Sequence, residues 1–317
     1  MIKIKFPDGM IKEFENGVSS LDIANSISPS LGKKSVAAKI NGEIVDLSSP
    51  INEDASFELL TAESKELDHM LNHSCAHLLA QAIKHLYPNA KFWVGPVIEE
   101  GFYYDIDLGD DVITDEAIEK IEKEMKKIVK DGKRIVRNEI SKAEALEKFK
   151  DDPYKVDLIS RMDESEPVIS CYTQGDFTDL CRGPHVDNTK ELKNFKLLKF
   201  SGAYYKGDSK NKMLQRIYGV CFPTEEELVA HLAELEEAKE RDHRKIGKDL
   251  GIFMTHDLVG KGMPLWLPNG AIVRKNLENY IYKKEQALGY KHVYTPCVGT
   301  VDLYKTSGHW DHYKEDM

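Results

Sequence analysis

The sequence predicts an α+β protein with several domains, and three observations lead to that fold class. With 317 residues, the chain is too long for one ordinary domain. Segments with alternating apolar residues and segments with helically spaced apolar residues are mixed along it. Hydrophobic residues make up 41% and charged residues 31%, as in soluble globular proteins. No apolar run reaches the length of a membrane span, and the N-terminus has no signal-peptide core.

Residues 1–61 are expected to form a small domain of the ubiquitin-like β-grasp type. The first strand has apolar residues at alternate positions, and a Pro-Asp-Gly turn leads into a second strand. A short helix capped by Ser19 or Ser20 follows, and a hairpin then closes at Asn41-Gly42 in a type I′ turn. The order is β-β-α-β-β-β, and its apolar markers are Ile2, Ile4, Phe6, Leu21, Ile23, Ala24, Val36–Ile40, Ile44–Leu47 and Phe57–Thr61.

Residues 62–223 are expected to form a second α+β domain. It opens with a helix over Glu66–Tyr87, which Pro88 ends. His73 and His77 lie four residues apart, opposite the apolar stripe, so we expect a layer from later strands to cover them. The stripe is Leu71, Cys75, Leu78, Leu79, Ala82 and Leu86. A further helix over 114–131, ending at Gly132, and strands over 168–173, 195–205 and 213–220 complete the prediction.

Residues 224–317 are expected to hold a charged connector helix and the beginning of a third domain. The connector spans 224–245 and is interpreted as a solvated helix between domains. Within 246–317 we expect a helix over 271–288 and a strand over 292–295, ended by Pro296. About seventy residues are few for an independent domain, so we expect this domain to be truncated at Met317.

Two spaced pairs, His73-x-x-x-His77 and Cys181-x-x-x-His185, are the candidate functional residues. A single His pair on a helix is usually no metal site, but the second pair changes that interpretation. Pro184 lacks an amide hydrogen, so the second pair lies on a bend that brings its two side chains to one side. Three imidazoles and a thiolate would suit tetrahedral zinc. Whether they hold a metal or a substrate stays open at this point.

The remaining composition favours a reduced protein of the cytoplasm. Five scattered cysteines do not suggest a disulfide framework, and Cys75 and Cys171 are interpreted as packed thiols. A net charge of −10 argues against nucleic-acid binding over the whole surface, although a local basic groove is compatible with it. By charge alone, the basic stretch 206–216 is interpreted as a solvated loop.

Five segments resemble bacterial threonyl-tRNA synthetases: NHSCAHLLAQAIKHLYP, GFYYDID, DLCRGPHV, GAYYKGDSKNKMLQRIYG and RDHRKIGKDL. The resemblance covers the chain in the domain order of that family. It implies a TGS domain over 1–61, an editing domain over 62–223 and a linker helix over 224–245. Residues 246–317 would begin a class II catalytic domain with an antiparallel sheet and motif 1, which builds the dimer interface in this family.

The resemblance implies a cytoplasmic, homodimeric threonine–tRNA ligase that uses ATP, Mg2+ and Zn2+ when full length. No arginine follows Arg274, so motifs 2 and 3, the ATP site and the catalytic zinc ligands would lie beyond Met317. Residues 1–317 are therefore expected not to aminoacylate. They are expected to hydrolyse Ser-tRNA(Thr), a mischarged product, and the basic stretch 206–216 is then expected to contact tRNA phosphates.

The resemblance also implies an editing site. In our working hypothesis, His73 and Lys155 position or activate water, Asp179 and His185 hold the amino group or terminal ribose, and Cys181 shapes the wall that excludes the methyl group of threonine. We favour no metal there, although a similar quartet binds zinc in alanyl-tRNA editing proteins. The expected site residues are His73, His77, Lys155, Asp179, Cys181 and His185.

Two other classes of function compete with this interpretation. A stand-alone metal-dependent hydrolase that clears mischarged tRNA in trans is favoured if the gene ends at Met317, although the piece of motif 1 counts against it. A non-enzymatic RNA-binding or regulatory module would use the β-grasp domain and basic loop. It would leave the His and Cys pairs unexplained.

Overall fold

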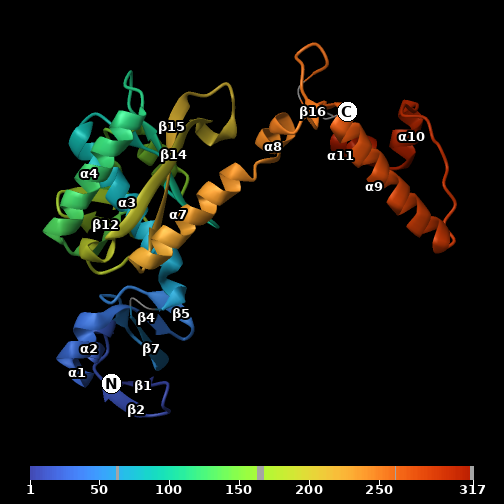
Figure 1. Ribbon diagram of the computed structural model, residues 1–317. Helices are drawn as coiled ribbons and strands as arrows, with labels where there is room; N and C mark the ends of the chain where they lie inside the picture. Colours follow the sequence, from blue (N-terminus) through green and yellow to red (C-terminus); the bar gives the residue numbers. More distant parts are fainter. Residues whose placement is uncertain (62–63, 163–167, 261, 315–317) are drawn as a thin grey trace. The chain divides into compact units, whose positions relative to one another are not determined.

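The computed structural model describes residues 1–61, 64–162, 168–260 and 262–314 (Figure 1). The chain forms two compact units, Met1–Ala233 and Glu234–Met317, which are described separately. The four-part division expected from the sequence stays a prediction. Its first boundary, at residues 62–63, and the expected truncation at Met317 lie outside the described residues.

The first unit begins with a five-stranded sheet in the order β2-β1-β7-β4-β5, in which β1 and β7 run parallel. Asn41 and Gly42 have φ angles of 52° and 91°, as the predicted type I′ turn requires. Ser19 caps α1 by accepting a hydrogen bond from the Asp22 N–H at 3.1 Å. Ile23 of α1 packs on the sheet. The elements are β1 Ile2–Lys5, β2 Ile11–Phe14, β3 Val18–Ser19, α1 Ser20–Ile27, α2 Pro29–Lys34, β4 Ser35–Ile40, β5 Glu43–Val45, β6 Pro50–Ile51 and β7 Ala55–Thr61.

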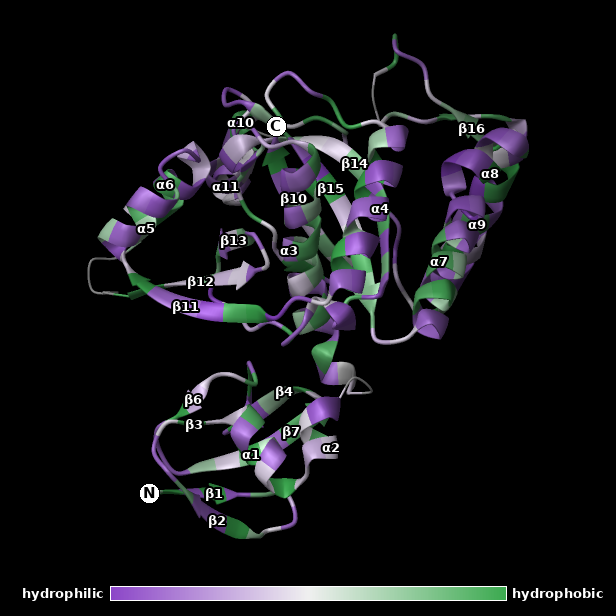
Figure 2. Ribbon diagram, turned by 90° about the vertical axis from the view of Figure 1, so that its left-hand side faces the viewer, coloured by the Kyte–Doolittle hydropathy of each residue, from purple (hydrophilic) through white to green (hydrophobic). Residues whose placement is uncertain are grey.

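A second sheet, antiparallel and in the order β14-β15-β10-β8, forms the middle of this unit, and β9 also pairs with β10. Two helices, α3 and α4, share one hydrophobic core with it, and Figure 2 shows hydrophobic and hydrophilic residues alternating along α4. Gly132 ends α4 with a φ of 63°, as expected. The elements are α3 Asp68–Leu86, β8 Lys91–Phe92, β9 Val97–Ile98, β10 Gly101–Asp107, α4 Asp115–Asp131, β14 Asn194–Tyr204 and β15 Met213–Phe222.

A smaller three-stranded sheet, β11-β12-β13, lies on the other side of α3 from the β14-β15 ribbon (Figure 2). Two short helices cover it around a small core of Ala145, Ile159 and Ile169. Apart from β12, the sequence patterns did not predict this layer. Its elements are β11 Ile135–Ser141, α5 Lys142–Lys148, α6 Pro153–Ser160, β12 Val168–Gln174 and β13 Phe177–Leu180.

Helix α3 is held in a fixed rotation between these layers. The side chain of Asn72 accepts from the Cys221 N–H at 2.9 Å and donates to the Cys221 carbonyl at 3.1 Å, which ties the helix to β15. Most of the predicted apolar stripe is buried against the sheet, but Leu86 is 39% exposed, because it lies in the last turn. His73 and His77 therefore face away from β15.

The connector is two helices rather than the single one expected. The first, α7 (Glu225–Glu240), ends before Asp242, whose carboxylate caps α8 (His243–Asp249) by accepting from the Arg244 N–H at 2.7 Å. A local cap thus starts a new helix where the charge pattern suggested one continuous helix.

The second unit contains a two-stranded antiparallel pair and a long helix that begins three residues earlier than expected. The predicted strand over 292–295 is wrong, because these residues pair with no strand in the described part of the chain. No helix among the described residues is long and apolar enough to cross a membrane. The elements are β16 Phe253–Met254, β17 Leu265–Trp266, α9 Pro268–Ala287, α10 Val301–Thr306 and α11 His309–Tyr313.

Candidate active site beside helix α3

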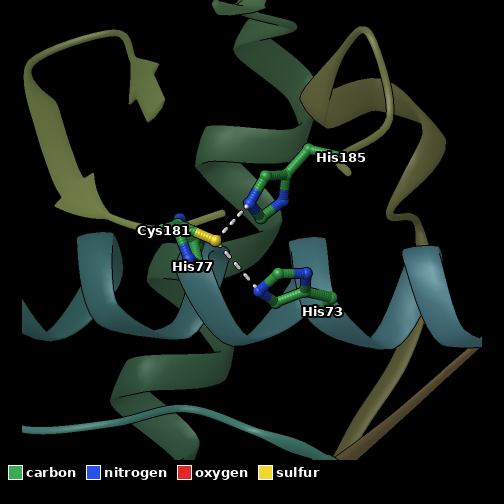
Figure 3. A group of neighbouring side chains, drawn as sticks. All are labelled: His73, His77, Cys181 and His185. Carbon is green, nitrogen blue, oxygen red and sulfur yellow. Dashed lines mark hydrogen bonds between the residues drawn. The ribbon is translucent and has the colours of Figure 1, made fainter. Parts of the chain in front are cut away.

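The two sequence pairs meet in space and form one cluster, which we call the His/Cys quartet (His73, His77, Cys181 and His185; Figure 3). The histidines of α3 point toward the segment that follows β13. Cys181 Sγ lies 3.1 Å from His73 Nε2 and 3.2 Å from His185 Nε2. The His185 ring lies 4.4 Å from that of His73 and 4.3 Å from that of His77, between centroids.

The bend expected at Gly183-Pro184 is present and contains a cis peptide bond. Gly183 has a φ of 77°, and a Cβ atom there would lie 2.0 Å from Tyr172 Oη, so the position requires glycine. Ser74, on α3, fixes the far side of the bend: its Oγ accepts from the Val186 N–H at 3.1 Å and lies 3.0 Å from His185 Nδ1. The covering layer is therefore this bend and β13.

Burial determines the charge state of the quartet. It lowers the pKa of His73 to about 4, and it lowers the pKa values of His77 and His185 well below 6.5. It also raises the pKa of the Cys181 thiol to about 12. At neutral pH the cluster thus consists of three neutral imidazoles and a thiol.

Two nitrogens of the quartet, His73 Nδ1 and His77 Nδ1, are buried without a hydrogen-bond partner. Buried polar atoms usually find partners, and unsatisfied ones are frequent at functional sites. Each imidazole ring can accept one hydrogen bond when neutral. The two Nδ1 atoms are therefore unsatisfied polar atoms within the buried part of the cluster.

A buried ion pair lies next to the quartet. Lys155 Nζ, from α6, lies 2.6 Å from Asp179 Oδ1, from β13, and both residues are almost fully buried. Tyr104 of β10 donates its hydroxyl proton to Asp179 Oδ2 and accepts from Lys155 Nζ at 3.1 Å. His77 Nε2 lies 3.8 Å from Asp179 Oδ2, so the pair is adjacent to the quartet. The six predicted site residues therefore lie in one contiguous group of side chains.

Lys155 and Asp179 also line a cavity of about 310 Å³. This volume is at the small end of the range for ligand pockets. Three lysines, Lys84, Lys91 and Lys148, surround it together with aromatic rings of Phe92, Phe149 and Phe177. Asp151, Asp152 and Asp176 line it as well, so the rim is polar and partly aromatic, with basic and acidic groups mixed.

The donor set of the quartet fits zinc. The four ligand atoms lie within 4.8 Å of one another. Tetrahedral zinc, with bonds of about 2.3 Å to sulfur and about 2.0–2.1 Å to nitrogen, separates these atoms by roughly 3.5 Å. The sulfur–nitrogen distances of 3.1 and 3.2 Å are a few tenths of an ångström shorter, so small side-chain rotations would make room.

The basic stretch 206–216 is largely paired within its own domain. Three of its four basic side chains form ion pairs with acidic residues, and the contacts expected with tRNA phosphates stay a prediction. The pairs are Lys206 with Asp157 at 3.2 Å, Lys212 with Asp107 at 2.7 Å and Arg216 with Asp105 at 2.6 Å.

Sequence reasoning did not identify three residues that organise the site. Tyr104 occurs in an aromatic strand segment, where a tyrosine looks like part of the core, and Ser74 and Tyr172 have no motif of their own. The GFYYDID segment was noted only for its resemblance. Pairing along β10 does not indicate which of its tyrosines faces Asp179.

Comparisons with known proteins agree with this geometry. Residues 2–61 match the TGS domain, and residues 169–218 match the threonyl and alanyl tRNA synthetase second additional domain. Asp179, Cys181 and His185 fall inside the second match. Over 316 residues the chain is 58% identical to the threonine–tRNA ligase of Staphylococcus epidermidis.

The chain matches threonine–tRNA ligases along its whole length. It is 57% identical to the threonine–tRNA ligase of Staphylococcus saprophyticus and 56% identical to that of Anoxybacillus flavithermus. It spans 49% of each relative, about half of its length. The resemblance to threonyl-tRNA synthetases and the α+β class with a TGS and an editing-type domain are thus confirmed.

Proposed function

We propose that this chain hydrolyses seryl-tRNA(Thr), as the editing part of a threonine–tRNA ligase. One observation carries the proposal: the neutral His/Cys quartet and the buried Lys155–Asp179 pair lie side by side. The match of residues 169–218 to the second additional domain of threonyl and alanyl tRNA synthetases supports it.

The physical need for such a site follows from the substrates. Serine lacks one methyl group of threonine, and a missing methyl group supports discrimination of only about 1–3 kcal/mol, roughly 10- to 200-fold. A second site that admits serine and excludes threonine by size multiplies this selectivity. Hydrolysis there transfers the seryl group from the ribose oxygen to water, releasing serine and free tRNA.

Hydrolysis requires a proton acceptor for water and donors for the developing oxyanion. The thiol of Cys181 has one proton and two nearby acceptors, His73 Nε2 and His185 Nε2. When the thiol donates to His185, His73 Nε2 is free to accept a proton from the attacking water. Lys155 supplies the buried cation beside Asp179, and we assign it to the water or the oxyanion.

Asp179 and Cys181 are assigned to recognition. In this proposal the Asp179 carboxylate exchanges one of its present donors, such as Lys155 or the Tyr104 hydroxyl, for the amino group of serine. His185 is assigned to that group or the terminal ribose. Cys181 is only partly exposed and lies between the two imidazoles, where its bulk would collide with an additional methyl group. These roles remain part of the proposal.

The proposed route uses no metal. If zinc binds, the His/Cys quartet would hold it and it would supply Lewis-acid activation of water. Elemental analysis of the purified chain, together with deacylation rates before and after chelation, distinguishes the two routes.

The direct test measures deacylation of seryl-tRNA(Thr) by residues 1–317. We expect hydrolysis by the unaltered chain and a loss of at least about 100-fold when His73→Ala and Cys181→Ala are combined. A matched control replaces an exposed histidine and cysteine elsewhere, His256→Ala and Cys297→Ala, and should retain the rate. A normal rate for the double variant of the quartet contradicts the proposal. Binding of tRNA without deacylation favours an RNA-binding module.

For the whole protein, we propose ligation of threonine to tRNA(Thr) with ATP and Mg2+, a zinc ion in the catalytic domain, and a homodimer. Residues 1–317 alone are predicted not to charge tRNA. An aminoacylation assay with threonine, ATP and tRNA(Thr) tests this, and any charging above background contradicts it. Sequencing the gene past codon 317 for an arginine-containing motif 2 separates the synthetase from a stand-alone trans-acting hydrolase.

A further inference from the structure

Asp46 belongs to the N-terminal β-grasp domain but contacts the proposed active site. It directly follows β5, at the end of the hairpin that begins at Asn41-Gly42. Its side chain is almost fully buried, with 7% of the residue exposed. A buried carboxylate needs strong hydrogen-bond donors, and Asp46 finds them in the editing-type domain.

Two donors from that domain satisfy the Asp46 carboxylate. The His185 backbone N–H donates to Oδ1 at 2.5 Å, and the Tyr172 hydroxyl donates to Oδ2 at 2.6 Å. The hydroxyl–carboxylate distance is typical of a hydrogen bond strengthened by charge, and the N–H···O contact is closer still. Asp46 therefore fastens the backbone of one quartet residue and the side chain beside it.

The two donors determine the position of the His185 ring. The Tyr172 ring packs against His185 with 4.4 Å between centroids, and its hydroxyl lies over Gly183. The His185 backbone is fixed by Asp46, and its ring contacts Ser74 Oγ on one side and Cys181 Sγ on the other. A shift of the backbone at His185 would thus change the contact with the thiol.

Packing between the β-grasp domain and the editing-type domain does not by itself explain why position 46 is a carboxylate. Apolar residues of the β-grasp domain already share a hydrophobic core with Leu67 and with Met70 of α3. They are Val36, Ala37 and Leu60. An apolar residue at position 46 could extend this core, but it would leave the His185 N–H and the Tyr172 hydroxyl without their acceptor. The specific contribution of Asp46 is that its two carboxylate oxygens point at the His185 N–H and the Tyr172 hydroxyl.

We propose that Asp46 is a positioning residue of the editing site, through which the β-grasp domain holds His185 and Tyr172 in the arrangement needed for hydrolysis. The inference rests on the proposed deacylation, but the contact itself is measurable without it. It assigns the TGS domain a part in the chemistry of the neighbouring domain, beyond that of an appended module.

The test compares Asp46→Ala, Asp46→Asn and Tyr172→Phe in the 317-residue chain. Asparagine retains an acceptor for the His185 N–H and an amide that Tyr172 can accept from, so it should largely rescue the alanine variant. Misplacement of a catalytic group by about 1 Å costs on the order of 100-fold in rate. We expect kcat for seryl-tRNA(Thr) deacylation to fall by roughly that factor in Asp46→Ala, with KM within about twofold. Glu43→Ala, exposed on the same hairpin, is the matched control.

An independent readout is hydrogen exchange of the His185 amide, observed by NMR in chain labelled with 15N-histidine. We expect slow exchange in the unaltered chain and in Asp46→Asn, and fast exchange in Asp46→Ala. An unchanged amide and an unchanged kcat in Asp46→Ala overturn the inference. So does a kcat loss in Asp46→Ala that asparagine does not rescue, or one explained by a smaller folded fraction. If the unaltered chain does not deacylate, the proposed function fails, while the exchange experiment still decides whether Asp46 holds His185.

Discussion

Removal of the Asp179 carboxylate should destabilise the first unit strongly, because it leaves a buried ammonium group behind. Asp179 accepts from Lys155 Nζ at 2.6 Å, from the Leu180 N–H at 2.8 Å and from the Tyr104 hydroxyl. In Asp179→Ala, the remaining described contact of the Lys155 ammonium is Tyr104 Oη at 3.1 Å.

The magnitude follows from the burial of both partners. Breaking a buried ion pair by removing one partner costs about 3–5 kcal/mol. The cavity of about 310 Å³ beside Lys155 allows water to approach the ammonium, so the low end, about 3 kcal/mol, is expected. In Asp179→Asn the added mutation Lys155→Met removes the unpaired charge, so this double variant should be more stable than Asp179→Asn alone.

Urea-induced unfolding measures these differences. Trp93 reports on the first unit if Trp266 and Trp310, which lie in the second unit, are replaced by phenylalanine. The midpoint shift at constant slope gives the change in the free energy of unfolding. A loss below about 1 kcal/mol for Asp179→Ala would refute the reasoning, because that is the value of an exposed pair. A double variant as unstable as the sum of the single variants would contradict the coupling.

Three further predictions follow from the contacts. Partial burial lowers the pKa of His85, but hydrogen bonds to Asp176 and Glu124 outweigh it, so the net pKa is raised above 6.5. This contribution to stability is complete below pH 6.5 and is lost as the pH rises through the raised pKa. In urea unfolding, His85→Gln should therefore lower the free energy of unfolding more at pH 5.5 than at pH 8.5. Equal losses at the two pH values would contradict the prediction. Gly183→Ala should destabilise by at least about 1–3 kcal/mol and slow deacylation, since its Cβ would displace Tyr172; an unchanged melting temperature would disprove this. Elemental analysis should find less than one zinc per chain at the His/Cys quartet, and a stoichiometric ion that disappears on Cys181→Ser would reverse that expectation.

The sequence predicted candidate site residues wherever a local rule determines the direction of their side chains. A spacing of four residues places His73 and His77 on one helical face, and Pro184 excludes a helix between Cys181 and His185. Within the resemblance, Lys155 and Asp179 could be named as members, and the structure brings them to the same network.

The rest depended on contacts that no local pattern encodes. Asp46 reaches the site through the packing of one domain on another, and Tyr104 through the register of β10. The strand expected over 292–295 was wrong because β-branched and aromatic residues form a strand only beside a partner, and none is present among the described residues. Periodicity reports burial, but it does not report which segments meet.

The two hydrogen bonds between the Asn72 side chain and the Cys221 backbone have a consequence for the length of α3. One residue inserted after Asn72 would turn the following helix by about 100° and carry both histidines out of reach of Cys181. The same insertion upstream of Asn72 would instead turn Leu71 away from the sheet. Helix α3 should therefore accept neither an insertion nor a deletion around Asn72.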